Sequence, residues 1–66
     1  MNDVVDKTFE SLFALEDIRQ IWRDTAPTHR LSPEQIMELT KLLESVKSNA
    51  DFILENLKNY ENHSNA

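Results

Sequence analysis

One short stretch of this sequence holds both residues that readily break a helix. The chain of 66 residues has no glycine, and its two prolines are Pro27 and Pro33. Proline lacks a backbone N–H and restricts the residue before it, so a helix in the first half must end near Thr25 or Ala26. Tight β-hairpins favour Asn-Gly or Asp-Gly turns, which a chain without glycine cannot make. The sequence therefore predicts two helices joined by one turn.

The second helix begins with several start signals at once. Ser32 and Gln35 have the spacing of a capping box, in which each side chain bonds the backbone N–H of the other residue. Pro33 suits the first helical position, and Glu34 places a negative charge at the positive end of the helix dipole. We expect this helix to run from about residue 33 to 61, with residues 62–66 as a frayed tail.

Apolar residues recur four and three apart along the second helix, which is the heptad spacing of helix bundles. We expect this series to face the first helix. Its members are Ile36, Leu39, Leu43, Val46, Ala50, Ile53, Leu57 and Tyr60.

The first helix, expected over about residues 3–25, has apolar residues on two sides. Because the connection at residues 26–31 is short, the two helices should be antiparallel neighbours. Residues whose numbers sum to about 58 should then lie level, with Phe9 packed on Ala50 and Leu15 near Leu43. The predicted fold is all-α, a single helical-hairpin domain over residues 1–66.

Such a hairpin is too small to bury a large core, and it leaves apolar side chains without a partner. The sequence has no cysteine to form a disulfide, so oligomerisation is the usual remaining source of stability. We expect a homodimer or higher oligomer that completes a four-helix bundle. The side chains predicted to take part in self-association are Phe9, Phe13, Ile21, Phe52, Leu57 and Tyr60.

Catalytic motifs are not found in the sequence. Without glycine there is no phosphate-binding loop, and without cysteine there is no thiol nucleophile or thiolate metal site. His29 and His63 have no histidine at helical spacing with which to hold a metal. We therefore expect a protein that is not an enzyme, with no catalytic residues, no metal site and no cofactor.

Charge and hydropathy restrict the partners. Seven basic and twelve acidic residues give the chain a net charge of -5. We therefore do not expect it to bind nucleic acid, whose phosphates are also negative. No stretch is apolar for the length of a membrane span, and the acidic N-terminus does not resemble a signal peptide. The sequence predicts a cytoplasmic protein that binds itself and another protein, and no membrane.

A group of basic and aromatic residues surrounds the predicted turn. One interpretation is a corner that recognises an acidic protein segment or RNA phosphate. The alternative is intramolecular, since Arg19 can pair with Glu16, and Arg23 lies where the helix dipole favours a cation. The possible partner-binding residues, including one exposed methionine on the second helix, are Arg19, Trp22, Arg23, His29, Arg30 and Met37.

The plan of a short chain, a capped second helix and a heptad series resembles the small helical-hairpin dimers typified by the plasmid copy-number Rop proteins. No motif matches residue by residue, so no functional residue is carried over from that family. By analogy, such hairpins are typical of phage, plasmid and bacterial accessory proteins.

We therefore interpret the chain as a noncatalytic adaptor or regulator that acts through protein–protein interaction. One alternative is a Rop-like RNA-binding regulator that uses the basic corner. The other is an acidic DNA mimic, because the first helix carries the acidic residues Asp3, Asp6, Glu10, Glu16 and Asp17.

Overall fold

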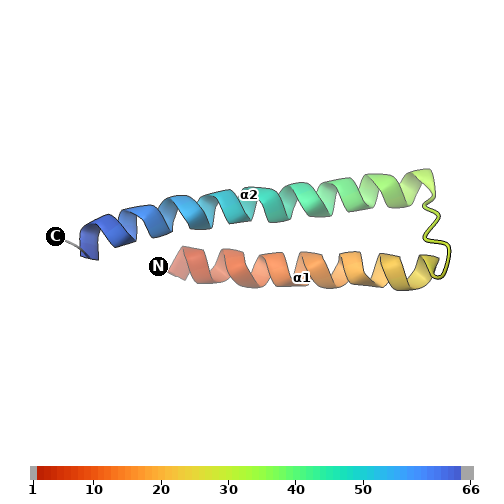
Figure 1. Ribbon diagram of the computed structural model, residues 1–66, viewed down its shortest axis with the longest axis horizontal. Helices are drawn as coiled ribbons and strands as arrows, with labels where there is room; N and C mark the ends of the chain where they lie inside the picture. Colours follow the sequence, from red (N-terminus) through yellow and green to blue (C-terminus); the bar gives the residue numbers. More distant parts are fainter. Residues whose placement is uncertain (1, 65–66) are drawn as a thin grey trace.

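The structure is a hairpin of two long helices. The computed structural model describes the backbone of residues 2–64 and the side chains of residues 2–59. Helix α1 spans Asn2–Thr25 and helix α2 spans Pro33–Ser64. The helices run antiparallel, side by side along their shared length, and form a rod of 52 × 16 × 16 Å (Figure 1). The described part of the chain contains no strand, as the all-α prediction requires.

Helix α2 begins with the predicted capping box. The backbone N–H of Gln35 donates to Ser32 Oγ over 3.1 Å, and the backbone N–H of Ser32 donates to Gln35 Oε1 over 2.9 Å. These two bonds satisfy backbone donors that the first turn of a helix leaves without partners. The helix continues through Ser64, three residues beyond the expected end, and overhangs α1 at the open end of the hairpin (Figure 1).

Each helix presents one narrow strip to the other. On both helices the least exposed residues recur three and four apart, so they occupy the a and d positions of a heptad. The strip of α1 consists of Val4, Lys7, Ser11, Ala14, Ile18, Ile21 and Thr25. The strip of α2 consists of Gln35, Leu39, Leu42, Val46, Asn49, Ile53 and Asn56.

The predicted α2 strip is therefore only half correct. Leu39, Val46 and Ile53 do lie among the less exposed residues, as expected. Ile36, Leu43, Ala50 and Leu57 are instead exposed, Ile36 and Leu43 at 52% each, and the side chain of Tyr60 lies outside the described residues. The reason is a rotation of α2 that places Leu42, Asn49 and Asn56 against α1 and moves the apolar positions one residue away to the edge of the contact.

A buried side-chain hydrogen bond fixes the register of the two helices. Asn49 is the most buried described residue, with 4% exposure, and its Nδ2 donates to Ser11 Oγ over 3.2 Å. Ser11 Oγ in turn donates to the backbone carbonyl of Lys7 over 2.9 Å. Residues that lie level thus have numbers summing to about 60, rather than the expected value of about 58.

The expected packing of Phe9 on Ala50 in the interior is wrong, because both residues are exposed in the hairpin. The prediction assumed that the large ring fills space above the smallest residue of the apolar series. Near the start of α1, the strip that faces α2 contains Lys7 and Ser11 instead, and the ring of Phe9 is exposed to solvent. Ile21 was expected to point away from the contact, yet it lies in the inward strip and is partly buried.

The inward strip is apolar near the turn and polar near the open end. At the turn end, Ile18 and Ile21 lie level with Leu42 and Leu39. Toward the open end the contact contains Ser11 and the buried amide of Asn49. The hydrophobic residues that reach burial are Ala14, Ile18 and Leu39 alone among the described residues.

Replacing Asn49 with alanine should destabilise the chain by about 1–2 kcal/mol, because the hydrogen bond to Ser11 and the packing of the amide are both lost. Ser11 keeps its bond to the Lys7 carbonyl, so no buried polar group is left without a partner. Urea unfolding followed by circular dichroism measures the change. Ser48→Ala, at an exposed neighbouring position, should change the free energy of unfolding by less than about 0.5 kcal/mol. Equal effects of the two substitutions would contradict the assigned register.

Candidate interaction surfaces

The described residues were compared first with the geometry of metal sites and pockets. No group of three or more histidines and acids among them could hold a metal ion. A shallow depression lined by Glu44, Lys47, Ser48 and Asp51 lies on one side of α2 alone. Within the part of the chain that the structure describes, no helix is both long enough and apolar enough to cross a membrane. The residues predicted from the sequence to bind a partner lie on the faces of the rod and at its turn end.

One face of the hairpin is apolar. The d positions are Lys7, Ala14 and Ile21 on α1 and Gln35, Leu42, Asn49 and Asn56 on α2, and each e position is the residue that follows a d position. In an antiparallel pair of helices the e positions of both helices lie on the same side of the contact. Here those positions carry large apolar side chains on both helices, apart from Thr8 and Ala50. We call this surface the apolar face and define it by Leu15, Trp22, Ile36, Leu43, Ala50 and Leu57.

The side chains of the apolar face are largely uncovered. Leu15 is 45% exposed, Trp22 40%, and Leu57 44%, while Ile36 and Leu43 are each 52% exposed. Large side chains spaced seven residues apart form a continuous strip rather than isolated surface hydrophobes. On α2 the a and e positions are apolar, whereas three of the four d positions carry Gln35, Asn49 and Asn56. Apolar residues beside the contact strip as well as in it are typical of a helix that is packed from two directions.

The opposite face is acidic along α1. The g positions of α1 are all acids, namely Asp3, Glu10, Asp17 and Asp24. Glu10 lies 3.5 Å from the ammonium of Lys7, and Asp24 accepts a hydrogen bond from Gln20 over 2.8 Å. We call the side that carries these four acids the acidic face. The two faces of the hairpin thus differ sharply in polarity.

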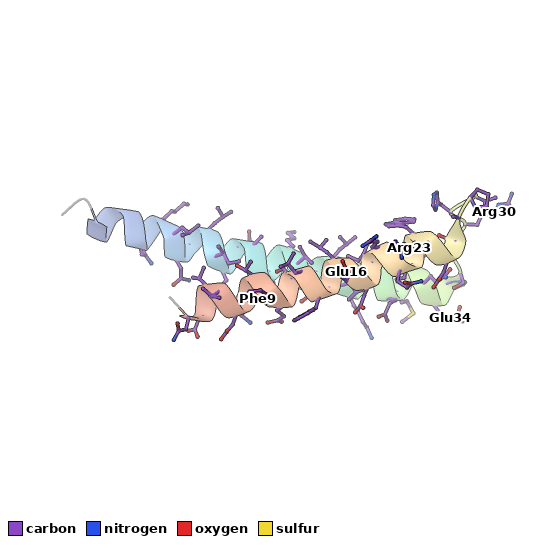
Figure 2. The ribbon with its side chains drawn as sticks, turned by 90° about the horizontal axis from the view of Figure 1, so that it is seen from below. Phe9, Glu16, Arg23, Arg30 and Glu34 are labelled. Atoms are coloured by element: carbon purple, nitrogen blue, oxygen red, sulfur yellow. The ribbon has the colours of Figure 1, made fainter. Side chains whose placement is uncertain are left out.

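The predicted self-association residues do not share one surface. Leu57 lies on the apolar face, whereas Phe52 lies on the acidic face and is 37% exposed. Phe13 is 69% exposed, and Phe9 lies on the outer side of α1 with Glu16 and Arg23 (Figure 2). Ile21 belongs to the contact between the helices. The side chain of Tyr60 lies outside the described residues.

Two residues of the predicted turn corner contact each other. The rings of Trp22 and His29 meet edge to face, with centroids 5.5 Å apart. The backbone N–H of His29 donates to the Thr25 carbonyl over 2.7 Å, which closes the end of α1. His29 adopts a φ of 56°, a left-handed conformation that glycine commonly takes after a helix. Histidine tolerates this conformation better than most residues do.

The three arginines of the corner differ in their pairing. Arg19 lies 3.5 Å from Glu16, which is the intramolecular pair considered from the sequence. Both partners are more than half exposed, so this pair adds little stability. Among the described residues, neither Arg23 nor Arg30 forms an ion pair. Both lie toward the turn end (Figure 2).

Met37, the remaining predicted partner-binding residue, is 62% exposed and lies one turn into α2. It occupies an f position of the heptad, on the side of α2 that faces away from α1. Sequence reasoning missed the apolar face as a unit, because it assigned Ile36, Leu43 and Ala50 to the contact within the hairpin. The signal was present in the flanking Leu42, which widens the apolar strip beyond two positions per heptad.

Comparison with known proteins gives one partial likeness. The chain is 40% identical over 53 residues to the enzyme O-phospho-L-seryl-tRNA:Cys-tRNA synthase 2 of Methanocella arvoryzae. The match covers 71% of this chain but 11% of the relative, so the chain spans about a tenth of that protein's length. No family model matches the chain, and no solved structure matches it.

Replacing His29 with valine should destabilise the hairpin by about 1–2 kcal/mol, because a β-branched residue is strained at positive φ. His29→Asn should stay within about 0.5 kcal/mol of the parent chain, since asparagine tolerates the same conformation. Thermal unfolding of both variants measures the difference. A valine variant as stable as the asparagine variant would show that residue 29 is free to leave the left-handed region.

Proposed function

We propose that this chain is a noncatalytic adaptor or regulator that acts through protein–protein contacts. The observation that carries the proposal is the amount of large apolar side chain left outside the helix contact. Among the residues whose side chains the structure describes, twelve large hydrophobic residues are exposed and three hydrophobic residues are buried. Exposed apolar surface of this extent on a small domain is characteristic of binding surfaces.

Self-association is part of this proposal. A chain with so few buried hydrophobic residues is marginal as an independent monomer. Two hairpins that pack together would form a four-helix bundle, in which each helix contacts two neighbours. The apolar e positions of α2, which lie beside the strip that contacts α1, support such an arrangement.

The partial relative supports a class of partner. Its name describes an enzyme that acts on O-phosphoseryl-tRNA, and the shared 53 residues are about the length of one hairpin. We infer that the shared segment is a helical module that accompanies this chemistry without performing it. The proposed partner of our chain is therefore an enzyme of that class, which the hairpin binds as a separate polypeptide or as part of a larger assembly.

Isothermal titration calorimetry can test this partner. Purified enzyme of the named activity, from the organism that encodes the chain, should bind the chain with saturation at a fixed stoichiometry. Reversing the charges of Arg19, Arg23 and Arg30 together should change the Kd by less than about threefold, because rim charges alter affinity little. A tRNA-dependent enzyme of unrelated activity serves as the control. Absence of binding to the named class, or equal binding to the control, would contradict the proposed partner.

A second candidate is RNA binding at the turn corner. It is favoured by the two arginines without an ion pair among the described residues, Arg23 and Arg30, beside the exposed ring of Trp22. Guanidinium groups bind phosphate, and aromatic rings stack on unpaired bases. The acidic face of the same rod opposes this function, because it would repel an RNA backbone.

Fluorescence anisotropy with a labelled tRNA distinguishes the two candidates. An RNA-binding corner predicts an affinity that falls steeply with salt and is lost in the Arg23→Gln, Arg30→Gln variant. A protein-binding adaptor predicts no saturable binding of free tRNA at 0.15 M salt. The double variant Lys41→Gln, Lys47→Gln, which removes two exposed charges from the first half of α2, is the matched control for the loss of positive charge.

A further inference from the structure

We propose that a second copy of this chain packs on the apolar face, and that the two turns lie at opposite ends of the resulting bundle. This inference rests on the self-association included in the proposed function. It adds the surface that is used and the direction in which the copies run. Three observations carry it: the excess surface of the hairpin, the unequal polarity of its two faces, and the sizes of the side chains on the apolar face.

The hairpin has an excess of surface that matches one dimer interface. Its accessible surface is 5382 Å². A compact monomer of 7.7 kDa exposes roughly 4,300 Å², which is about 1,000 Å² less. A standard protein interface covers about 800 Å² on each partner. Packing of one further copy would therefore bring the chain to the exposure expected of a folded protein.

The polarity of the two faces selects the surface. A second copy on the acidic face would place the four acids of each α1 opposite or beside those of its partner. Like charges in that arrangement repel, and their desolvation is costly. On the apolar face the same symmetric contact brings leucine, isoleucine and tryptophan side chains together. A two-fold dimer uses one surface twice, so a self-complementary apolar strip is the surface suited to it.

Side-chain size selects the direction. On the apolar face, Trp22 and Ile36 are neighbouring large side chains near the turn, Leu15 and Leu43 follow, and Thr8 and Ala50 form a slender layer before Leu57. With both turns at one end, the bulky layers would meet each other and the slender layers would leave a void. With the turns at opposite ends, the layer of Leu15 and Leu43 meets the slender layer of Thr8 and Ala50, so the void is filled.

The spacing of the α2 residues agrees with that direction. The middle of α1 is level with Val46 and Lys47 of α2, according to the register set by Asn49. About that centre, a two-fold axis brings Leu43 opposite Ala50 of the second copy, and Ile36 opposite Leu57 of the second copy. A leucine opposite an alanine is the large-and-small pairing found in well-packed helix interfaces.

The surface is tested by two substitutions to glutamate on α2. Leu43→Glu places a charge on the apolar face, and Met37→Glu places the same charge on the outer side at a similarly exposed residue. Sedimentation equilibrium should show that Leu43→Glu weakens dimerisation at least tenfold, while Met37→Glu leaves it within about threefold. The proposal would be overturned if Met37→Glu weakened dimerisation more than Leu43→Glu does, or if the parent chain were monomeric at about 100 µM.

The direction is tested without altering the apolar face. Because the sequence has no cysteine, Glu34→Cys accepts a single spin label at the turn end of α2, outside that face. Turns at opposite ends place the two labels about 37 Å apart along the bundle. Turns at the same end place them within about 25 Å, allowing for helix spacing and label length. Pulsed electron paramagnetic resonance measures this distance, and the shorter value would overturn the proposed direction. This test does not depend on whether the Leu43→Glu variant folds.

These experiments distinguish failure of the inferred dimer from failure of the proposed function. If the parent chain is monomeric and Leu43→Glu abolishes binding of the enzyme partner, the apolar face belongs to that partner. The adaptor function then stands, and the inferred second copy is wrong. If the chain dimerises through the apolar face but binds no enzyme of the named class, the inference stands and the proposed partner is wrong.

Discussion

A helix packed against one neighbour can bury only a single strip of its surface, and this limit governs the whole hairpin. Both helices of the structure are long enough to carry a wide apolar surface, yet each covers the other along its a and d positions alone. Even within the covered strip, no side chain is completely buried. Burial of apolar surface is the main favourable term in folding, so a chain arranged in this way depends on further contacts for much of its stability.

Local features of the fold could be predicted from the sequence because they depend on neighbouring residues. The capping box of Ser32 and Gln35 requires side chains three residues apart and the start of a helix, and both conditions can be read directly. The same holds for the break at Pro27 and for the pair formed by Arg19 and Glu16. No information from distant parts of the chain is needed for these features.

The side of α2 that contacts α1 could not be predicted in the same way. The apolar residues of this helix recur four and three apart at its a and e positions, and this periodicity alone predicts that the whole apolar series faces α1. The side that does face α1 depends on the partner strip, where Ser11 offers a hydroxyl that an asparagine can bond and Ala14 permits close approach. A buried asparagine is unfavoured on hydropathy grounds, although such residues fix register in helix pairs. The candidate surface was consequently divided between two predicted roles, with Leu43 placed inside and Leu57 assigned to self-association.

The uneven composition of the helix contact also bears on how the hairpin assembles in time. Its apolar half adjoins the turn, where Ile18 and Leu42 lie level and the loop to be closed is short. Closing a short loop costs the least chain entropy, and contacts close in sequence form first in fast-folding helical proteins. The polar half around Asn49 joins afterwards and is the weaker part, so transient opening should begin at the far end of the rod. The molecule would then close from its turn outward, in the manner of a zipper, with the register of the last layers set by an amide rather than by a methyl group.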